Sequence, residues 1–122
     1  MSKRTELAAQ FIGHVCAKQF DQAGALLAES VQMTIPEVGA IPPGRSIVET
    51  ALRMASDSGR GMEKVGWSKP HEEQDGTVRI PGKAPVGLVG LIAKLLRKQV
   101  KLTIALTFAE NDEIRKVDLV VG

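Results

Sequence analysis

Hydrophobic positions follow helical spacing through much of the first half of the chain and strand spacing through most of the second. Apolar residues three or four positions apart predict three helices, over about 5–19, 22–28 and 47–57. Asp21 is the expected N-cap of the second helix, and Ser46 with Glu49 resembles a capping box for the third. The side of the third helix expected to face the core consists of Ile47, Ala51, Met54 and Ala55.

Alternation of apolar and polar residues predicts strands in the remaining segments. A first strand covers 31–35 and is followed by a Pro- and Gly-rich loop over 36–44. Two further strands, 63–68 and 77–80, are expected to pair across the Asp75-Gly76 turn. The clearest alternation lies in 101–108 and 115–121, which are separated by a polar turn at 111–113. These last two segments predict a half-buried antiparallel hairpin.

The segment between the two predicted hairpins has an amphipathic pattern. Leu88, Leu91, Ile92, Leu95 and Leu96 recur at helical spacing and predict a helix over 86–98. We expect this helix to pack on the sheet or over the mouth of a pocket. A strand that continues into the sheet, a membrane-surface helix and a partner-binding helix remain alternatives.

Length and composition bound the class of protein. The 122 residues, 43% hydrophobic and 25% charged, predict one globular domain spanning 1–122. A net charge of +2 is too small to indicate nucleic-acid binding, and no apolar run reaches the ~18 residues of a membrane span. The single cysteine, Cys16, permits no intramolecular disulfide and fits a cytoplasmic protein. With two histidines and one cysteine, no metal site and no cofactor are expected.

Two segments carry a resemblance to a known fold. ALLAESVQMTIP, residues 25–36, is similar to the junction of short helix and strand in ketosteroid isomerase, and PPGRSIVETAL, residues 42–52, resembles limonene epoxide hydrolase. Both belong to the nuclear transport factor 2-like superfamily, together with scytalone dehydratase and the SnoaL-like polyketide cyclases. The resemblance implies a cone-shaped α+β fold in which a curved, mixed or antiparallel sheet packs against N-terminal helices around one pocket.

The catalytic positions of those enzymes carry apolar residues here. The resemblance places Phe11 where ketosteroid isomerase has a Tyr hydroxyl, Ile35 where it has its Asp base, and a position near Ile104 where it has a second Asp. Enolisation needs a base and hydrogen-bond donors, which Phe and Ile do not supply. The Arg-x-Asp pattern of the epoxide hydrolase is also absent from TVRIPGKA, residues 77–84.

An apolar pocket is therefore the predicted site. The residues expected to line it are Phe11, His14, Val15, Met33, Ile35, Trp67, Leu102, Ile104, Leu106 and Phe108. The first hypothesis is a non-enzymatic protein that binds a small apolar molecule. The second is a hydrolase, dehydratase or cyclase that uses His14, Glu37 or a pocket water, and the third is an interaction module with a filled interior.

A homodimer is the predicted assembly, formed through the outward face of the last two strands. That face consists of Lys101, Thr103, Ala105, Thr107, Lys116, Asp118 and Val120. Three other candidates have simpler interpretations: Cys16 as a residue packed on the sheet, His71 as part of a solvated hairpin tip, and Glu49 with Arg53 as a surface ion pair.

Overall fold

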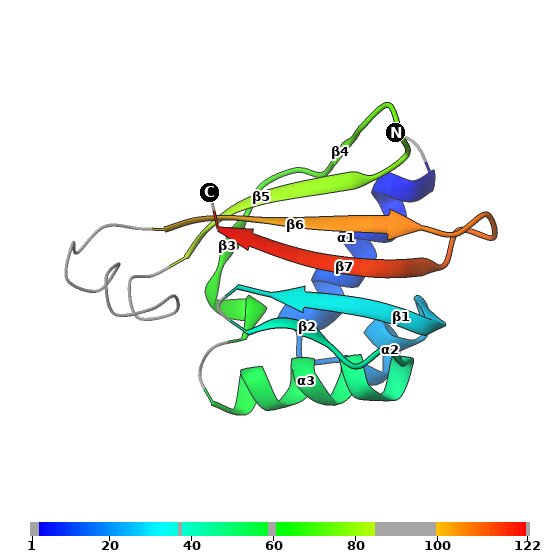
Figure 1. The fold of residues 1–122 in the computed structure, drawn as a ribbon. Coiled ribbons are helices and arrows are strands. Elements are labelled where there is room, and N and C mark those ends of the chain that lie inside the picture. Colours follow the sequence, from blue (N-terminus) through cyan, green and yellow to red (C-terminus); the bar gives the residue numbers. More distant parts are fainter. Residues whose placement is uncertain (1–2, 37, 59–60, 85–99, 122) are drawn as a thin grey trace.

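The computed structural model describes residues 3–36, 38–58, 61–84 and 100–121, and it has an α+β architecture built on one mixed sheet (Figure 1). The helices in these ranges are α1 (Lys3–Cys16), α2 (Phe20–Gly24), α3 (Arg45–Asp57) and a 3-10 helix, η1 (Met62–Lys64). The strands are β1 (Leu27–Ile35), β2 (Gly39–Ile41), β3 (Gly66–Trp67), β4 (His71–Glu72), β5 (Val78–Ala84), β6 (Val100–Phe108) and β7 (Ile114–Val121).

The strands are ordered β2-β1-β7-β6-β5-β3, and β4 also pairs with β5. β1 runs parallel to β7, and the other pairs are antiparallel. α1 lies across one face of the sheet, and α3 lies beside β1 and β2 at one edge (Figure 1). The predicted α+β class with helices packed on a mixed sheet is confirmed. The sheet is not strongly curled, so the cone is shallower than the resemblance implies.

The hairpin predicted from the last two segments is confirmed. Ile104 pairs with Leu119 and Leu106 with Val117, so that the inward positions of both strands form one apolar face. The register shifts between Thr107 and Phe108. Because of this irregularity Ile114 is buried while Arg115 is exposed, although simple alternation places Arg115 on the inward face.

The core lies between α1 and the sheet. Ala8, Phe11, Ile12 and Val15 form the buried face of α1, as the helical spacing predicts. They belong to the same apolar cluster as the sheet residues Val31, Val78, Ile104, Leu106 and Val117.

α3 differs from its prediction in its start and in its buried side. It begins at Arg45 after Gly44, whose φ of 138° suits glycine, and neither Ser46 nor Glu49 caps it. Its buried residues are Val48, Leu52 and Ser56, whereas Ile47 and Met54 are 43% and 65% exposed. α3 packs on β1 and α2 through the side that carries Val48, Leu52 and Ser56, which is adjacent to the predicted side. The positions of β1 and α2 determine which side of the helix is covered.

Three further predictions on local structure need correction. The expected helix over 22–28 is the shorter α2, preceded by Gln19 rather than capped by Asp21, and the chain has entered β1 by Leu27. The expected strand over 63–68 is η1 followed by the two-residue β3. β5 extends the predicted 77–80 strand and pairs with β4 and β3 in turn. The predicted helix over 86–98 lies outside the described residues.

Candidate functional site

The structure brings nine of the ten residues predicted to line a pocket into contact inside the fold. Six of them are buried in the main apolar cluster, namely Phe11, Val15, Met33, Ile104, Leu106 and Phe108. Ile35 and Trp67 pack against that cluster and are partly buried. Leu102 is buried in a small adjoining cluster with Val65, which Trp67 also contacts.

His14, the remaining predicted residue, stands apart from this apolar cluster. It lies near the end of α1, is half-buried, and its Nδ1 is 3.0 Å from Oε1 of Gln19. Glu37, the other residue named in the enzyme hypothesis, lies outside the described residues. His71 is exposed on β4, opposite Arg79.

Among the described residues, the apolar core is more fully buried at one end of the sheet than at the other. At the more buried end, Leu27 and Ile114 are fully buried beside Phe108. At the opposite end, the partly buried apolar side chains are Ile35, Ile41, Trp67 and Leu119. The strand register brings these four to the end where β1, β5 and β7 finish and β6 begins. We refer to this group as the open end of the core.

Trp67 is held firmly at the open end. Its indole Nε1 donates a hydrogen bond to the carbonyl oxygen of Met62 at 3.0 Å. Its ring lies over Gly82 on β5, where a Cβ atom would come within 2.7 Å of Trp67 Cε3 and of Val65 Cγ1. A glycine at this position therefore allows the ring to pack against the strand backbone. Alternation in the sequence predicted the side of the sheet on which Trp67 lies, but not this glycine contact.

A polar group that sequence reasoning missed lies in η1. One carboxylate oxygen of Glu63 accepts a hydrogen bond from Ser56 Oγ at 2.9 Å, and Ser56 is only 6% exposed. The other oxygen, Oε2, is buried and has no hydrogen-bond partner among the described residues. A buried carboxylate oxygen without a partner is unfavourable, so this atom is a candidate acceptor for a bound donor. The sequence predicted a strand over 63–68 in place of η1, and this wrong assignment gave no reason to expect a buried carboxylate at Glu63.

Cys16 belongs to the same region and is a poor nucleophile. Its thiol lies 3.8 Å from the Met62 carbonyl oxygen. Burial, and then the nearby Glu63 carboxylate, raise the pKa of the Cys16 thiol. Because the thiolate is the reactive form, a raised pKa lowers its reactivity at neutral pH.

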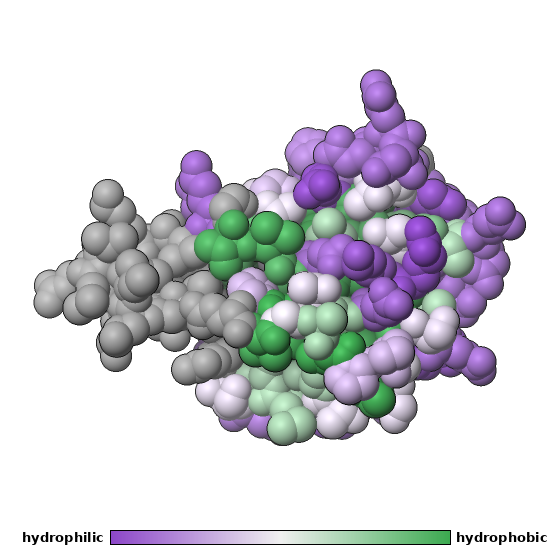
Figure 2. Space-filling model, viewed as in Figure 1, coloured by the Kyte–Doolittle hydropathy of each residue, from purple (hydrophilic) through white to green (hydrophobic). Residues whose placement is uncertain are grey.

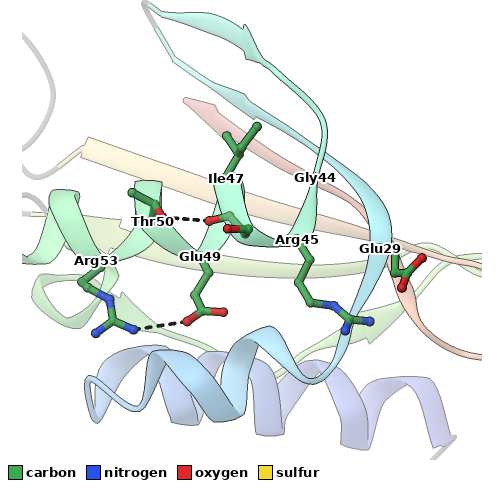
Figure 3. A pocket seen from close by; sticks show the side chains of 8 residues that line it. Glu29, Gly44, Arg45, Ile47, Glu49, Thr50 and Arg53 are labelled. Atoms are coloured by element: carbon green, nitrogen blue, oxygen red, sulfur yellow. Dashed lines mark hydrogen bonds and ion pairs between the residues drawn. The ribbon is translucent and has the colours of Figure 1, made fainter.

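A second candidate site is an open hollow of about 570 Å³ on the surface of α3 (Figure 3). It is lined by Glu29, Gly44, Arg45, Ser46, Ile47, Glu49, Thr50 and Arg53. Both of its cations already have partners within the fold. Arg45 donates to the Leu27 carbonyl oxygen at 2.9 and 2.7 Å, and Arg53 lies 3.2 Å from Glu49 and from Asp21. The predicted Glu49–Arg53 surface ion pair is confirmed, and the hollow offers little charge for a ligand.

Two classes of site are not supported in the described part of the chain. No group of three or more His, Cys, Asp or Glu residues there could hold a metal ion. None of the helices in those ranges is long and apolar enough to cross a membrane.

Comparison with known proteins gives the fold but no activity. No protein-family model and no curated protein matches the sequence. A solved nuclear transport factor 2-like protein of unknown function from Cytophaga hutchinsonii is similar over 100% of this chain and 92% of its own, with 16% identity and a TM-score of 0.68. A steroid delta-isomerase from Pseudomonas aeruginosa is similar over 100% and 82%, with 14% identity and a TM-score of 0.72.

The epoxide hydrolase/cyclase-like enzyme SalBIII, which acts in pyran ring formation in the polyether salinomycin, is a third similar structure. The match covers 98% of this chain and 91% of that enzyme, with 16% identity and a TM-score of 0.63. The chain thus has the nuclear transport factor 2-like, or cystatin-like, fold that the resemblance implies. At these identities the likeness establishes the fold alone.

Proposed function

We propose that the protein binds a small hydrophobic molecule at the open end of its apolar core, without catalysing a reaction. The observation that carries this proposal is the uneven closure of the core. Four apolar side chains stay partly exposed together at one end, whereas at the opposite end Leu27, Phe108 and Ile114 are buried and Leu26 alone of that group is partly exposed. A hydrophobic ligand that covered them would gain about 25 cal/mol for each Å² of apolar surface removed from water. The proposed setting is the reducing cytoplasm, which suits the free thiol of Cys16.

The chemistry of the interior supports binding rather than steroid isomerisation. Phe11 and Ile104 are fully buried and Ile35 is partly buried in the same cluster, so the three positions that the resemblance assigns to catalytic groups are apolar neighbours. The similar structures include a steroid isomerase and a polyether-forming enzyme. A ring-containing or polyketide-like molecule is therefore the ligand class that we propose.

The test compares a variant that fills the open end with one that adds the same ring elsewhere. Leu119→Phe adds volume at the open end, and Met54→Phe adds it on the outer side of α3, where Met54 is 65% exposed. Protein purified from cells is examined by native mass spectrometry, and displacement of the neutral probe N-phenyl-1-naphthylamine is measured. We expect a retained apolar compound and probe binding in the wild type and in Met54→Phe, and weaker binding in Leu119→Phe.

Equal probe binding by the two variants, with no retained compound, would contradict the proposal. That result would favour an interaction module whose interior is filled by its own side chains.

The buried oxygen of Glu63 favours a second candidate function, an enzyme acting on a small apolar substrate. Glu63 Oε2 has no hydrogen-bond partner in the described residues, and general acid–base catalysis uses such groups. Hydrolase, dehydratase or cyclase chemistry would require Glu63 to contact the substrate. Once a ligand is identified, turnover by the wild type that Glu63→Gln lacks, while the variant still binds, would support the enzyme. Binding without turnover by the wild type would argue against it.

We propose in addition a homodimer formed through the sheet face that points away from α1. This face combines the 6%-exposed Ala105 with the 46%-exposed Val120, and Asp118 forms an ion pair with Lys116 at 3.7 Å. Figure 2, which views this face, has hydrophobic surface near the end of β7 and over β1 and β2, with polar groups between. Such a mixed surface suits a moderate interface.

Light scattering after size-exclusion chromatography should give about twice the chain mass of 13.1 kDa. Val120→Lys should dissociate the dimer, whereas Met54→Lys, on α3, should leave it intact. A wild-type mass equal to one chain at micromolar concentration would refute the dimer.

A further inference from the structure

The outer face of the sheet contains two lysines that lie directly opposite each other. Lys83 on β5 and Lys101 on β6 are paired in the antiparallel register, and both are exposed. Residues opposite each other in an antiparallel pair have Cβ atoms about 4.5–5.5 Å apart, and like charges there are destabilising. The pair therefore concentrates positive charge on this face, and an anion bound there would relieve the repulsion.

No carboxylate in the described part of the chain supplies that anion. The ion pairs formed there involve Lys3, Arg4, Arg45, Arg53, Arg79 and Lys116. Arg79, which lies on the same strand β5 as Lys83, differs from the two lysines because it has an ion-pair partner, Glu73, at 3.5 Å. Within the described residues, Lys83 and Lys101 are thus two neighbouring positive charges without a partner.

A hollow of about 240 Å³ lies beside the two lysines. It is lined by Ser68, Pro81, Gly82, Lys83, Lys101, Leu102 and Thr103. On its other side, Lys83 pairs with Gly66 of β3, and a Cβ atom at Gly66 would meet only the Lys83 carbonyl oxygen at 3.8 Å. The absence of a side chain at Gly66 therefore leaves room between Lys83 and Ser68. Two lysines and the hydroxyl-bearing residues Ser68 and Thr103 thus line the same hollow.

We propose that this hollow binds a phosphate group between Lys83 and Lys101. A phosphate dianion offers several acceptor oxygens, and each ammonium offers three donors on a flexible stem. Ser68 is exposed beside the pair and adds a hydroxyl donor. The site lies on the opposite side of the sheet from the apolar core, so its occupation does not depend on the proposed hydrophobic ligand. Lys101 and Thr103 also belong to the face proposed for the dimer, so phosphate and a second copy of the chain would compete for this part of the sheet. A soluble phosphate compound or a phospholipid headgroup could supply the group.

The test measures binding of inorganic phosphate by NMR titration of backbone amides, at constant ionic strength set with sodium chloride. We expect shift changes centred on residues 66–68, 81–83 and 101–103. Lys83→Gln and Lys101→Gln should each weaken binding roughly two- to fivefold, which corresponds to one exposed ion pair. The double variant should lose the response. Arg115→Gln removes the same charge from an exposed position on β7 and should bind phosphate as the wild type does.

A second readout needs no ligand. At low ionic strength without phosphate, either single Gln variant should be at least as stable as the wild type, because it removes like-charge repulsion. Co-sedimentation with phosphatidylglycerol vesicles that the double variant loses would assign the phosphate to a lipid, and its absence would assign it to a soluble compound. The proposal is overturned if the wild type shows no localised response to phosphate, or if the double variant responds equally. It is also overturned if the single variants change only the oligomeric state, since the lysines would then serve the dimer.

Discussion

Gly82→Ala should destabilise the protein through one specific contact. A Cβ atom built on Gly82 comes within 2.7 Å of Trp67 Cε3 and of Val65 Cγ1, and 3.0 Å from Trp67 Cζ3. Real Cβ atoms do not approach other atoms so closely, so the indole ring and Val65 must move. Trp67 resists this movement because its Nε1 is hydrogen-bonded to the Met62 carbonyl oxygen at 3.0 Å.

The expected loss is about 1–3 kcal/mol of unfolding free energy, the usual cost of adding a methyl group to a well-packed site. Gly66 on the neighbouring strand β3 is the matched control. Its added Cβ would meet nothing closer than 3.8 Å. Gly66→Ala should therefore be neutral or stabilising by up to about 1 kcal/mol, because alanine reduces the freedom of the unfolded chain.

Urea unfolding followed by fluorescence measures both effects, since Trp67 is the single tryptophan of the chain. Gly82→Ala should lower the midpoint and shift the native emission to longer wavelength as the ring becomes more exposed. Gly66→Ala should leave the native emission unchanged. The reasoning is refuted if the two alanine variants have equal stability and the same native emission, because the ring would then not be held against the Gly82 backbone.

Three further predictions concern contacts away from Gly82. Arg4 lies 3.1 Å from Asp112 and 5.6 Å from the centre of the Phe108 ring, so Arg4→Ala should lower stability at pH 7. The hydrogen bond from Arg4 lowers the pKa of Asp112 in the folded protein. The stability that this interaction contributes is therefore fully present above the pKa of Asp112 in the unfolded chain, about 3.9, and is lost as the pH falls through the lower pKa of the folded protein. The difference between the urea midpoints of wild type and variant should therefore narrow at low pH without vanishing, because the contact of Arg4 with Phe108 does not titrate, and a constant difference would contradict this. Arg45→Gln should lower the free energy of unfolding by about 1–3 kcal/mol, because it removes both hydrogen bonds from the guanidinium group to the Leu27 carbonyl oxygen. The control Arg115→Gln, at an exposed position, should change the urea midpoint little. Burial and Glu63 raise the pKa of Cys16, so thiol labelling should be slow at pH 7, and Glu63→Gln should shift its pH profile downward. An unchanged profile would show that the Glu63 charge does not act on the thiol.

The sequence by itself determined the elements whose signals are local. The buried side of α1 follows from helical spacing through Phe11 and Val15, and the β6–β7 hairpin follows from alternation through Ile104 and Leu106. The apolar character of the predicted site follows from the same residues. Each of these patterns is set by covalent neighbours a few positions apart, so the chain carries them whatever the rest of the fold does.

Only the tertiary structure decided which of several possible surfaces is covered. On α3 two adjacent stripes could be buried, and packing on β1 and α2 selected Val48 and Leu52 instead of Ile47 and Met54. The end of the core at which Trp67 and Leu119 stay partly exposed depends on the register of strands that are distant in sequence. The opposition of Lys83 and Lys101 and the burial of the Glu63 oxygen have the same origin. Packing between segments distant in sequence fixes these contacts, and within the sheet a shift of one residue moves each side chain to the other face.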